Sequence, residues 1–570
     1  MFKKPFLYIF LVFGLTLLNF AAAESSLETR LLEANQRLDE IYRSLEEAEA
    51  NQSLLGLRLE KAVVTGKNIF RISTYRSSGA GEQAIAFDGY PFWFDPVQDR
   101  VQTNGNKANN LFQMNIYGRA AAGYELNARL DVSNVWPSTG GTVSAGPIFA
   151  KAQRGNTTII VGNYHSQITP FTLYYPVLQR PYEGELWQLL RARRTAEIGL
   201  EGQARELQGV KVDYRSGLFS LSPQAAVIRT HEDGYPFYRY LFALQGGFEL
   251  SPFSQVGLNY LRIVDDLRTG LLSNKPAANS VISMDFSGEV RRGLSVAGEI
   301  AQSTYSKDYG TIMHLEGAAK HLRIRQQFAN VTLGYDFSHV TPDFYNPAAQ
   351  SRDRTLASGA QFGTEGALTL EGFSLQDAVW EWMPFGPATP NRKSKLWSVQ
   401  INNIFGSLAF HHGSGEELSP TDAIGNLSLA HDAIRHYQTS GWGIKIEFSQ
   451  LIPGSGSVLR WPITFAAQGE NLRARRDDDP QTLADEAVDY NRKTTAGSLK
   501  VAFTPRTSLL VGWQKRNFAN DTTQEIKALA LNYKPHARWD LLVLGEESAR
   551  TGSAEPYTAR ALKFILGVDF

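Results

Sequence analysis

The sequence predicts an all-β fold: a transmembrane antiparallel β-barrel of about 22 strands, within a range of about 16 to 26, preceded by a short α-helical coiled coil. Three observations support this prediction. The C-terminal segment Leu562–Phe570 alternates between apolar and mixed positions. Similar alternating segments recur along most of the chain, whereas the stretch before them carries apolar residues at heptad spacing.

The N-terminus has the pattern of a secretory signal. Lys3 and Lys4 precede an apolar stretch, Pro5–Leu18, and small residues, Ala21–Ala23, stand before Glu24. A basic start, a short apolar core and a small-residue cleavage site predict a cleaved signal peptide over residues 1–23 rather than a membrane anchor. The chain contains no cysteine, which excludes a lipoprotein anchor after Ala23.

Residues 24–66 are predicted to form a separate coiled-coil helix. Apolar residues follow alternating steps of four and three residues over about five heptads, with Gln52 as the polar exception. Gly66 is predicted to end the helix, because glycine is favoured just past a helix C-terminus. An amphipathic helix packed on its own domain is the alternative. The predicted seam residues are Leu27, Leu31, Leu38, Ile41, Leu45, Leu55 and Leu59.

Residues 67–570 are predicted to form the barrel. Many segments alternate with period two, among them Glu125–Val135, Tyr238–Leu250 and Leu499–Phe503. Several strands end at an apolar or aromatic residue followed by a turn proline, as at Pro252, Pro505 and Pro535. Proline favours turns and cannot donate to a β-ladder, so these connections are interpreted as short turns at one end of the barrel.

Composition agrees with a barrel and points to no other class. Lys+Arg and Asp+Glu both number 57, so no net charge indicates nucleic acid as a partner. After residue 23 the chain has no apolar run long enough for a transmembrane helix. Mean hydropathy is −0.26, but a barrel presents only alternate residues to lipid, which lowers its mean hydropathy. Aromatic residues make up 11% of the chain, as girdles at two lipid interfaces require.

The C-terminal segment resembles the last strand of Gram-negative outer-membrane β-barrels, where an apolar face ending in phenylalanine is the signal for the assembly machinery. An edge strand of a soluble sandwich is the alternative. The residues of this predicted assembly signal are Leu562, Phe564, Leu566, Val568 and Phe570.

The order of signal peptide, heptads, barrel and terminal phenylalanine resembles porins for sugars and phosphate that carry an N-terminal periplasmic coiled coil. This resemblance implies location in the outer membrane with the helix in the periplasm. It also implies a homo-oligomer, with a trimer preferred, and contacts with outer-membrane lipid, lipopolysaccharide and the assembly machinery.

The long irregular segments are predicted to be extracellular loops or lumen inserts. Ser77–Asn110 and His165–Arg194 are the predicted constrictions, because they combine length, aromatic residues and charge. The sequence Asp-Gly-Tyr-Pro-Phe occurs twice, at 88–92 and 233–237, and either contacts solutes in the pore or feeds an interfacial girdle. The candidate pore or solute contacts are Tyr90, Phe92, Trp93, Tyr235 and Phe237.

No catalytic, cofactor or metal site is predicted. The sequence lacks the nucleophile elbow, the P-loop and the H-E-x-x-H pattern. The basic run 473–476 stands next to the acidic run 477–479 and is interpreted as a solvated loop or rim.

The expected function is therefore a porin-like channel for passive diffusion of small hydrophilic solutes. A structural anchor or scaffold tethered through the coiled coil is the alternative. A hydrolase embedded in the barrel wall is the third hypothesis.

Overall fold

The chain divides into two compact units, residues 1–62 with 118–123 and residues 63–117 with 124–570, and the second unit contains the barrel. The predicted signal peptide and the predicted helix as far as residue 58 lie outside the described residues. The computed structural model describes residues 59–79, 94–95, 100–101, 105–120, 124–136, 141–145, 148–173, 184–189, 205–229, 239–265, 278–306, 314–344, 346, 348, 388, 391–419, 434, 436–448, 462–476, 488–518, 521–552 and 556–570.

Within these ranges the secondary structure is almost entirely extended. No helix in the described ranges is long and apolar enough to cross a membrane. The strands are β1 (Leu59–Gly79), β2 (Phe94–Asp95), β3 (Arg100–Val101), β4 (Gly105–Ala120), β5 (Tyr124–Trp136), β6 (Gly141–Ala145), β7 (Phe149–Arg154), β8 (Thr157–Ser166), β9 (Arg205–Ser216), β10 (Phe219–Arg229), β11 (Arg239–Ser251), β12 (Ser254–Asp265), β13 (Ala278–Arg291), β14 (Leu294–Ser306), β15 (His314–Phe328), β16 (Val331–Val340), β17 (Arg392–Asn403), β18 (Gly406–Glu416), β19 (His436–Glu447), β20 (Ile463–Arg476), β21 (Val488–Thr504), β22 (Thr507–Phe518), β23 (Thr523–Tyr533), β24 (Trp539–Thr551) and β25 (Tyr557–Asp569).

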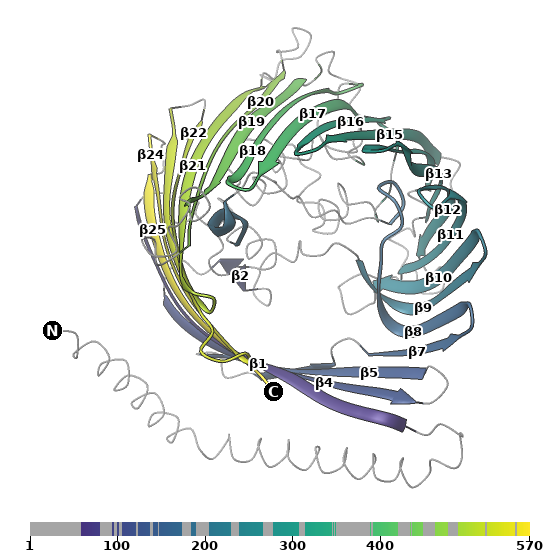
Figure 1. Ribbon diagram of the computed structural model, residues 1–570, viewed down its shortest axis with the longest axis horizontal. Coiled ribbons are helices and arrows are strands. Elements are labelled where there is room, and N and C mark those ends of the chain that lie inside the picture. Colours follow the sequence, from purple (N-terminus) through teal and green to yellow (C-terminus); the bar gives the residue numbers. More distant parts are fainter. Residues whose placement is uncertain are drawn as a thin grey trace, which may run out of the picture. The chain divides into compact units, whose positions relative to one another are not determined.

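All of these strands except β2 and β3, which pair with each other, belong to one closed antiparallel sheet. The first strand closes the ring on the last, with Lys67 opposite Asp569 and Gly79 opposite Tyr557. The sheet counts 23 strands, but β6 and β7 pair with successive parts of β5 and form one interrupted wall strand. The wall of the described barrel therefore has 22 strands, as predicted, and Figure 1 looks into the ring that they form.

The two ends of the barrel differ in their connections. At one end most turns have two residues, such as 217–218 between β9 and β10 and 329–330 between β15 and β16. The predicted turn prolines Pro252, Pro505 and Pro535 all lie at this end, which we call the short-turn end. The opposite, long-loop end carries the long connections 167–204 and 341–391. Both terminal wall strands have their outer ends, Leu59 and Asp569, at the short-turn end.

Alternate residues along a wall strand face out of the barrel and into the lumen. In β11, Phe242 and Leu244 are 45% and 41% exposed on the outer face, whereas Leu241 and Ala243 are buried on the inner face. β25 follows the same rule: Leu562 is 55% exposed on the outside, and Lys563 is buried on the inside. The apolar alternation recognised in the C-terminal segment thus forms the outward-facing side of the last strand.

The C-terminal phenylalanine lies on the outside of the seam between β25 and β1. Phe570 exchanges two backbone hydrogen bonds with Gly66 of β1, of 3.0 and 2.9 Å. Its ring stacks on Phe112 of β4, with ring centroids 5.4 Å apart. A Cβ atom on Gly66 would overlap that ring. Glycine at position 66 therefore leaves the space that the Phe570 side chain occupies.

The prediction of a helix through residue 66 was wrong at its C-terminal end. β1 begins at Leu59, so Leu59 belongs to a strand rather than to the coiled-coil seam, and Gly66 lies within the strand instead of ending a helix. The reason is local: Val63, Val64 and Thr65 are β-branched and favour extended backbone, and this segment pairs with the neighbouring wall strands.

Candidate functional site: a segment folded into the lumen

The connection between β8 and β9, residues 167–204, has two described parts that lie inside the barrel, and we call this connection the lumen strap. Its described parts are residues 167–173 and the helical turn 185–189 with Gly184 before it. The helical turn lies inside the ring of strands on the side of β21, while β8, which leads into the strap, lies across the ring (Figure 1). The segment predicted as a constriction, His165–Arg194, overlaps the strap.

The first end of the strap is held by a buried carboxylate. Thr169 Oγ1 donates a hydrogen bond of 2.5 Å to Glu299 Oε1, and the Phe171 backbone N–H donates one of 3.2 Å to Glu299 Oε2. Glu299 lies on the inner face of β14 and is 2% exposed. The strap forms a tight turn here, because the Thr172 N–H also bonds to the Thr169 carbonyl at 3.1 Å. One side chain of the wall thus fixes both the position and the orientation of this turn.

Phe171 fills the space beside this carboxylate. Its ring meets that of Phe344 edge to face, with centroids 5.6 Å apart, and that of His321 on β15, with centroids 6.4 Å apart. Asn346 donates through Nδ2 to the carbonyl groups of Phe171 and Thr172. Two residues that follow β16, Phe344 and Asn346, therefore pack on the strap and bind two of its carbonyl groups.

The other end of the strap is held by apolar contact. Leu186 and Trp187 are buried against the inner face of strands β21 to β25. Gly512 of β22 leaves room for them, since a Cβ atom there would lie 2.6 Å from Leu186 Cδ2 and 2.9 Å from Trp187 Cζ2. Beside this contact, Lys500 Nζ donates hydrogen bonds of 2.8 and 2.7 Å to the Glu185 carboxylate.

Both ends of the strap cover apolar patches of the lumen wall, where a water-filled barrel would carry polar side chains. The patch under the first end is formed by Leu207, Ala226, Leu241, Ala243, Leu261, Ile263, Val281, Ala301, Ala319 and Val340. The patch under the second end is formed by Ala496, Leu510, Ile526, Ala528, Ala530, Leu542, Leu544, Ala559 and Ala561. The strap therefore belongs to the folded structure of the barrel.

The wall beyond the first patch is polar. Asp336 on β16 accepts a 2.6 Å hydrogen bond from Arg323 Nε and a 2.8 Å hydrogen bond from Arg325 Nη2. These arginines follow His321 along the inner face of β15 toward the short-turn end, and their side chains are 44% and 36% exposed. Two guanidinium groups therefore share one carboxylate on this part of the lumen wall.

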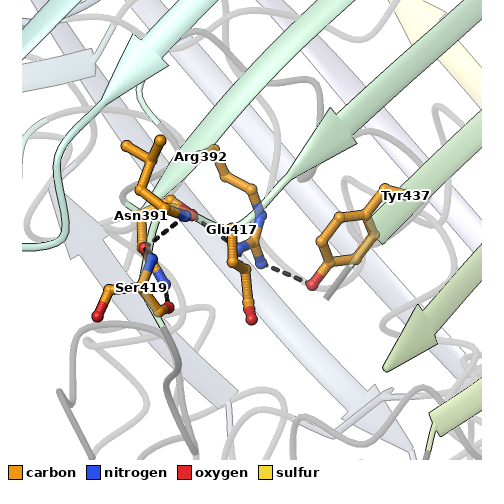
Figure 2. Close-up of polar contacts among 6 residues, drawn as sticks. Asn391, Arg392, Glu417, Ser419 and Tyr437 are labelled. Atoms are coloured by element: carbon orange, nitrogen blue, oxygen red, sulfur yellow. Dashed lines mark hydrogen bonds and ion pairs between the residues drawn. The ribbon is translucent and has the colours of Figure 1, made fainter. Parts of the chain in front are cut away.

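The connection 341–391 is fixed where it enters β17 (Figure 2). Arg392 Nη1 donates to Glu417 Oε1 at 2.9 Å, and its Nη2 donates to the Tyr437 hydroxyl at 2.8 Å. The side chains of this ion pair are only 3% and 1% exposed. Asn391 Oδ1 accepts from the backbone N–H of Ser419 at 2.9 Å. The network joins the roots of two long-loop-end connections to β17, β18 and β19.

The candidate solute contacts named from the sequence, Tyr90, Phe92, Trp93, Tyr235 and Phe237, lie outside the described residues. The side chains that hold the strap, Glu299 above all, were not predicted. A signal for the apolar patches is present in the sequence. Within Tyr238–Leu250, which was predicted to alternate, Tyr240–Leu244 is apolar on both faces, and so is Leu541–Leu544. Strands covered on both faces have such continuous apolar runs. Among the described residues, no group of three or more acidic or histidine side chains could hold a metal ion.

No protein-family model matches the chain, and no curated protein matches it. Several solved structures are similar over most of its length. Pseudomonas aeruginosa OpdQ is 8% identical, with a TM-score of 0.38, over 89% of this chain and 99% of that chain. The translocation pore of the P pilus usher PapC is 9% identical, with a TM-score of 0.39, over 89% and 99%. P. aeruginosa OccK2, solved in complex with glucuronate, is 8% identical, with a TM-score of 0.36, over 90% and 99%. Likenesses at this level assign neither a family nor a solute to the chain.

Proposed function

We propose that the protein is an outer-membrane channel for passive diffusion of small hydrophilic solutes, narrowed from within by the lumen strap. The observation that carries the proposal is a 22-strand wall whose lumen-facing apolar patches are both covered by one inserted segment. A wall of this size encloses a space too wide for its own side chains to fill. The rest of the lumen wall includes charged side chains that water can hydrate, such as Arg323 and Arg325.

The proposal includes a location and a topology. The exposed apolar outer face suits a lipid bilayer, and short turns on one side with long loops on the other are the arrangement of outer-membrane barrels. The short-turn end would face the periplasm, with residues 1–23 removed as a signal peptide and the helix before β1 in the periplasm. A homo-oligomer, preferably a trimer, and recognition of the terminal Phe570 face by the assembly machinery are parts of the same proposal.

Reconstitution in a planar bilayer tests the channel. The full chain should give stepwise conductance at defined voltage, and uncharged sugars of increasing size should lower that conductance until they no longer enter. If both the full chain and a variant without the strap assemble as barrels but conduct no ions, the channel hypothesis is contradicted. That result would favour the scaffold role for the same barrel.

A further inference from the structure

Four basic side chains form a group on the outer face of neighbouring strands, where they do not line the lumen. Arg473, Lys493 and Lys527 are exposed, and Lys515 is half-buried. The residue before each of them along the strand, Leu472, Arg492, Gln514 and Ile526 respectively, is buried. Because successive side chains of a strand point to opposite faces, the four basic side chains point away from the lumen.

The register places these four residues along one line across β20, β21, β22 and β23. Arg473 is opposite Asn491, two residues before Lys493, and Lys493 is opposite Asn517, two residues after Lys515. Lys515 is opposite Glu525, two residues before Lys527. Each is therefore a diagonal neighbour of the next, with about 7–8 Å between them. We call this group the basic diagonal.

The basic diagonal stands at the edge of the lipid-facing surface. On the same strands and the same face, the residues toward the short-turn end are Leu499, Val511 and Leu529, which are 39%, 42% and 42% exposed. The basic diagonal therefore lies on the long-loop side of an apolar belt, where lipid headgroups meet the barrel. Lysine and arginine suit this level because their stems cover apolar surface while their charges reach the headgroups.

The nearby carboxylates have partners of their own on this face. Glu547, opposite Lys527, accepts a 2.6 Å hydrogen bond from Arg560 Nε. Glu525, opposite Lys515, accepts a hydrogen bond from Trp513 Nε1. The basic diagonal and Arg560 together supply five positive charges, and Glu525 and Glu547 supply two negative ones. The surface therefore has a net positive charge at the headgroup level.

We propose that the basic diagonal binds the phosphate groups of lipopolysaccharide in the outer leaflet. The charges are spread over four strands, so a headgroup with more than one phosphate matches them better than a phospholipid with a single phosphate. Each basic side chain close to an anionic membrane surface contributes about a fivefold gain in affinity. The inference rests on the membrane orientation in the proposed function but not on conduction.

The test compares two charge-matched variants of the full chain in detergent. One removes the basic diagonal (Arg473→Gln, Lys493→Gln, Lys515→Gln and Lys527→Gln), and the control removes four basic residues of the short turns (Arg292→Gln, Arg506→Gln, Lys534→Gln and Arg538→Gln). A charge-conserving variant, Lys493→Arg with Lys515→Arg and Lys527→Arg, is the second control. Only protein that shows the heat-dependent gel shift of an assembled barrel is used, and binding of bisphosphorylated lipid A is measured by native mass spectrometry.

Loss of the basic diagonal should weaken lipid A binding more than about a hundredfold, while both controls stay within about twofold of the native chain. Dephosphorylated lipid A should not bind, and inorganic phosphate should not displace the lipid. Equal loss in the basic-diagonal and short-turn variants, or undiminished binding in the former, would overturn the proposal, as would equal binding of dephosphorylated lipid A or displacement by inorganic phosphate. Conductance of the same preparations is recorded separately, so a silent barrel that still binds lipid A would refute only the channel.

Discussion

The two ends of the lumen strap are held differently. At Thr169 and Phe171 it forms hydrogen bonds with one buried carboxylate, that of Glu299. At Leu186 and Trp187 it makes apolar contacts with the second apolar patch of the wall. Hydrogen bonds are directional, so Glu299 fixes the position and orientation of the first end, which also buries Phe171 and Leu173 in the first apolar patch. Apolar contact is non-directional and grows with buried area, so the burial of Leu186 and Trp187 stabilises the second end without fixing its orientation in the same way.

The two ends of the strap therefore show a division of labour. The apolar end keeps the strap inside the barrel, and the polar end determines where it lies across the lumen. Because the chain contains no cysteine, a single cysteine placed on the wall beneath either end reports whether that end has left the wall. Ser498, which lies against Gly184, and Ala319, which lies in the first apolar patch, are suitable sites.

The largest effect is expected from the double substitution Leu186→Ala with Trp187→Ala. Truncation of a buried tryptophan costs about 3–5 kcal/mol, which is enough to release the apolar end. A cysteine at position 498 should then react rapidly with a water-soluble maleimide, and channel conductance should rise. Gln188→Ala, an exposed change in the same helical turn, is the control. A cysteine that stays protected in the double variant would show that the polar end alone retains the strap.

A smaller effect is expected from Glu299→Gln. The substitution removes one of the two carboxylate acceptors, and a buried donor left without its partner costs about 1–3 kcal/mol. The strap should stay inside the lumen but shift at its first end, so a cysteine at 319 should become reactive while one at 498 stays protected. Asp285→Asn, at the position opposite Glu299 on β13, is the control, because it removes a neighbouring carboxylate but no hydrogen-bond acceptor of the strap. Equal reactivity at both cysteines would contradict the division of labour.

The smallest effect is expected from Lys500→Gln. This lysine pairs with Glu185 at 2.7 Å, but the side chains are 31% and 54% exposed, and exposed ion pairs contribute about 0–1 kcal/mol. Labelling at 498 should rise less than in the alanine double variant at every salt concentration. An effect as large as that of the double variant would mean that charge, not apolar area, holds the second end.

The wall of the barrel could be predicted from the sequence because it obeys a local rule. Period-two alternation and turn prolines act within a few residues, so the strand count, the short-turn end and the outward apolar face of Leu562–Phe570 were all predicted correctly. The end of the helix was not, because heptad spacing through Leu59 can also be read as a strand. This segment forms a strand because it pairs with neighbouring wall strands that are distant in sequence.

The sequence predicted the strap only as a long segment that could enter the lumen. Its attachment joins residues far apart in sequence, such as Thr169 with Glu299 and Glu185 with Lys500, and no local pattern records such pairs. The two-sided apolar runs Tyr240–Leu244 and Leu541–Leu544 did carry part of the information. Each indicates that something covers the inner face of its strand, but neither indicates which segment does so.

If the strap narrows an otherwise open lumen, excision of the strap should widen the channel. Residues 167–204 are replaced by a short Gly-Ser turn between β8 and β9, and single-channel conductance is compared with that of the native chain. Conductance should rise several-fold and larger sugars should enter, while the heat-dependent gel shift of the assembled barrel is retained. An assembled barrel with unchanged conductance would contradict it.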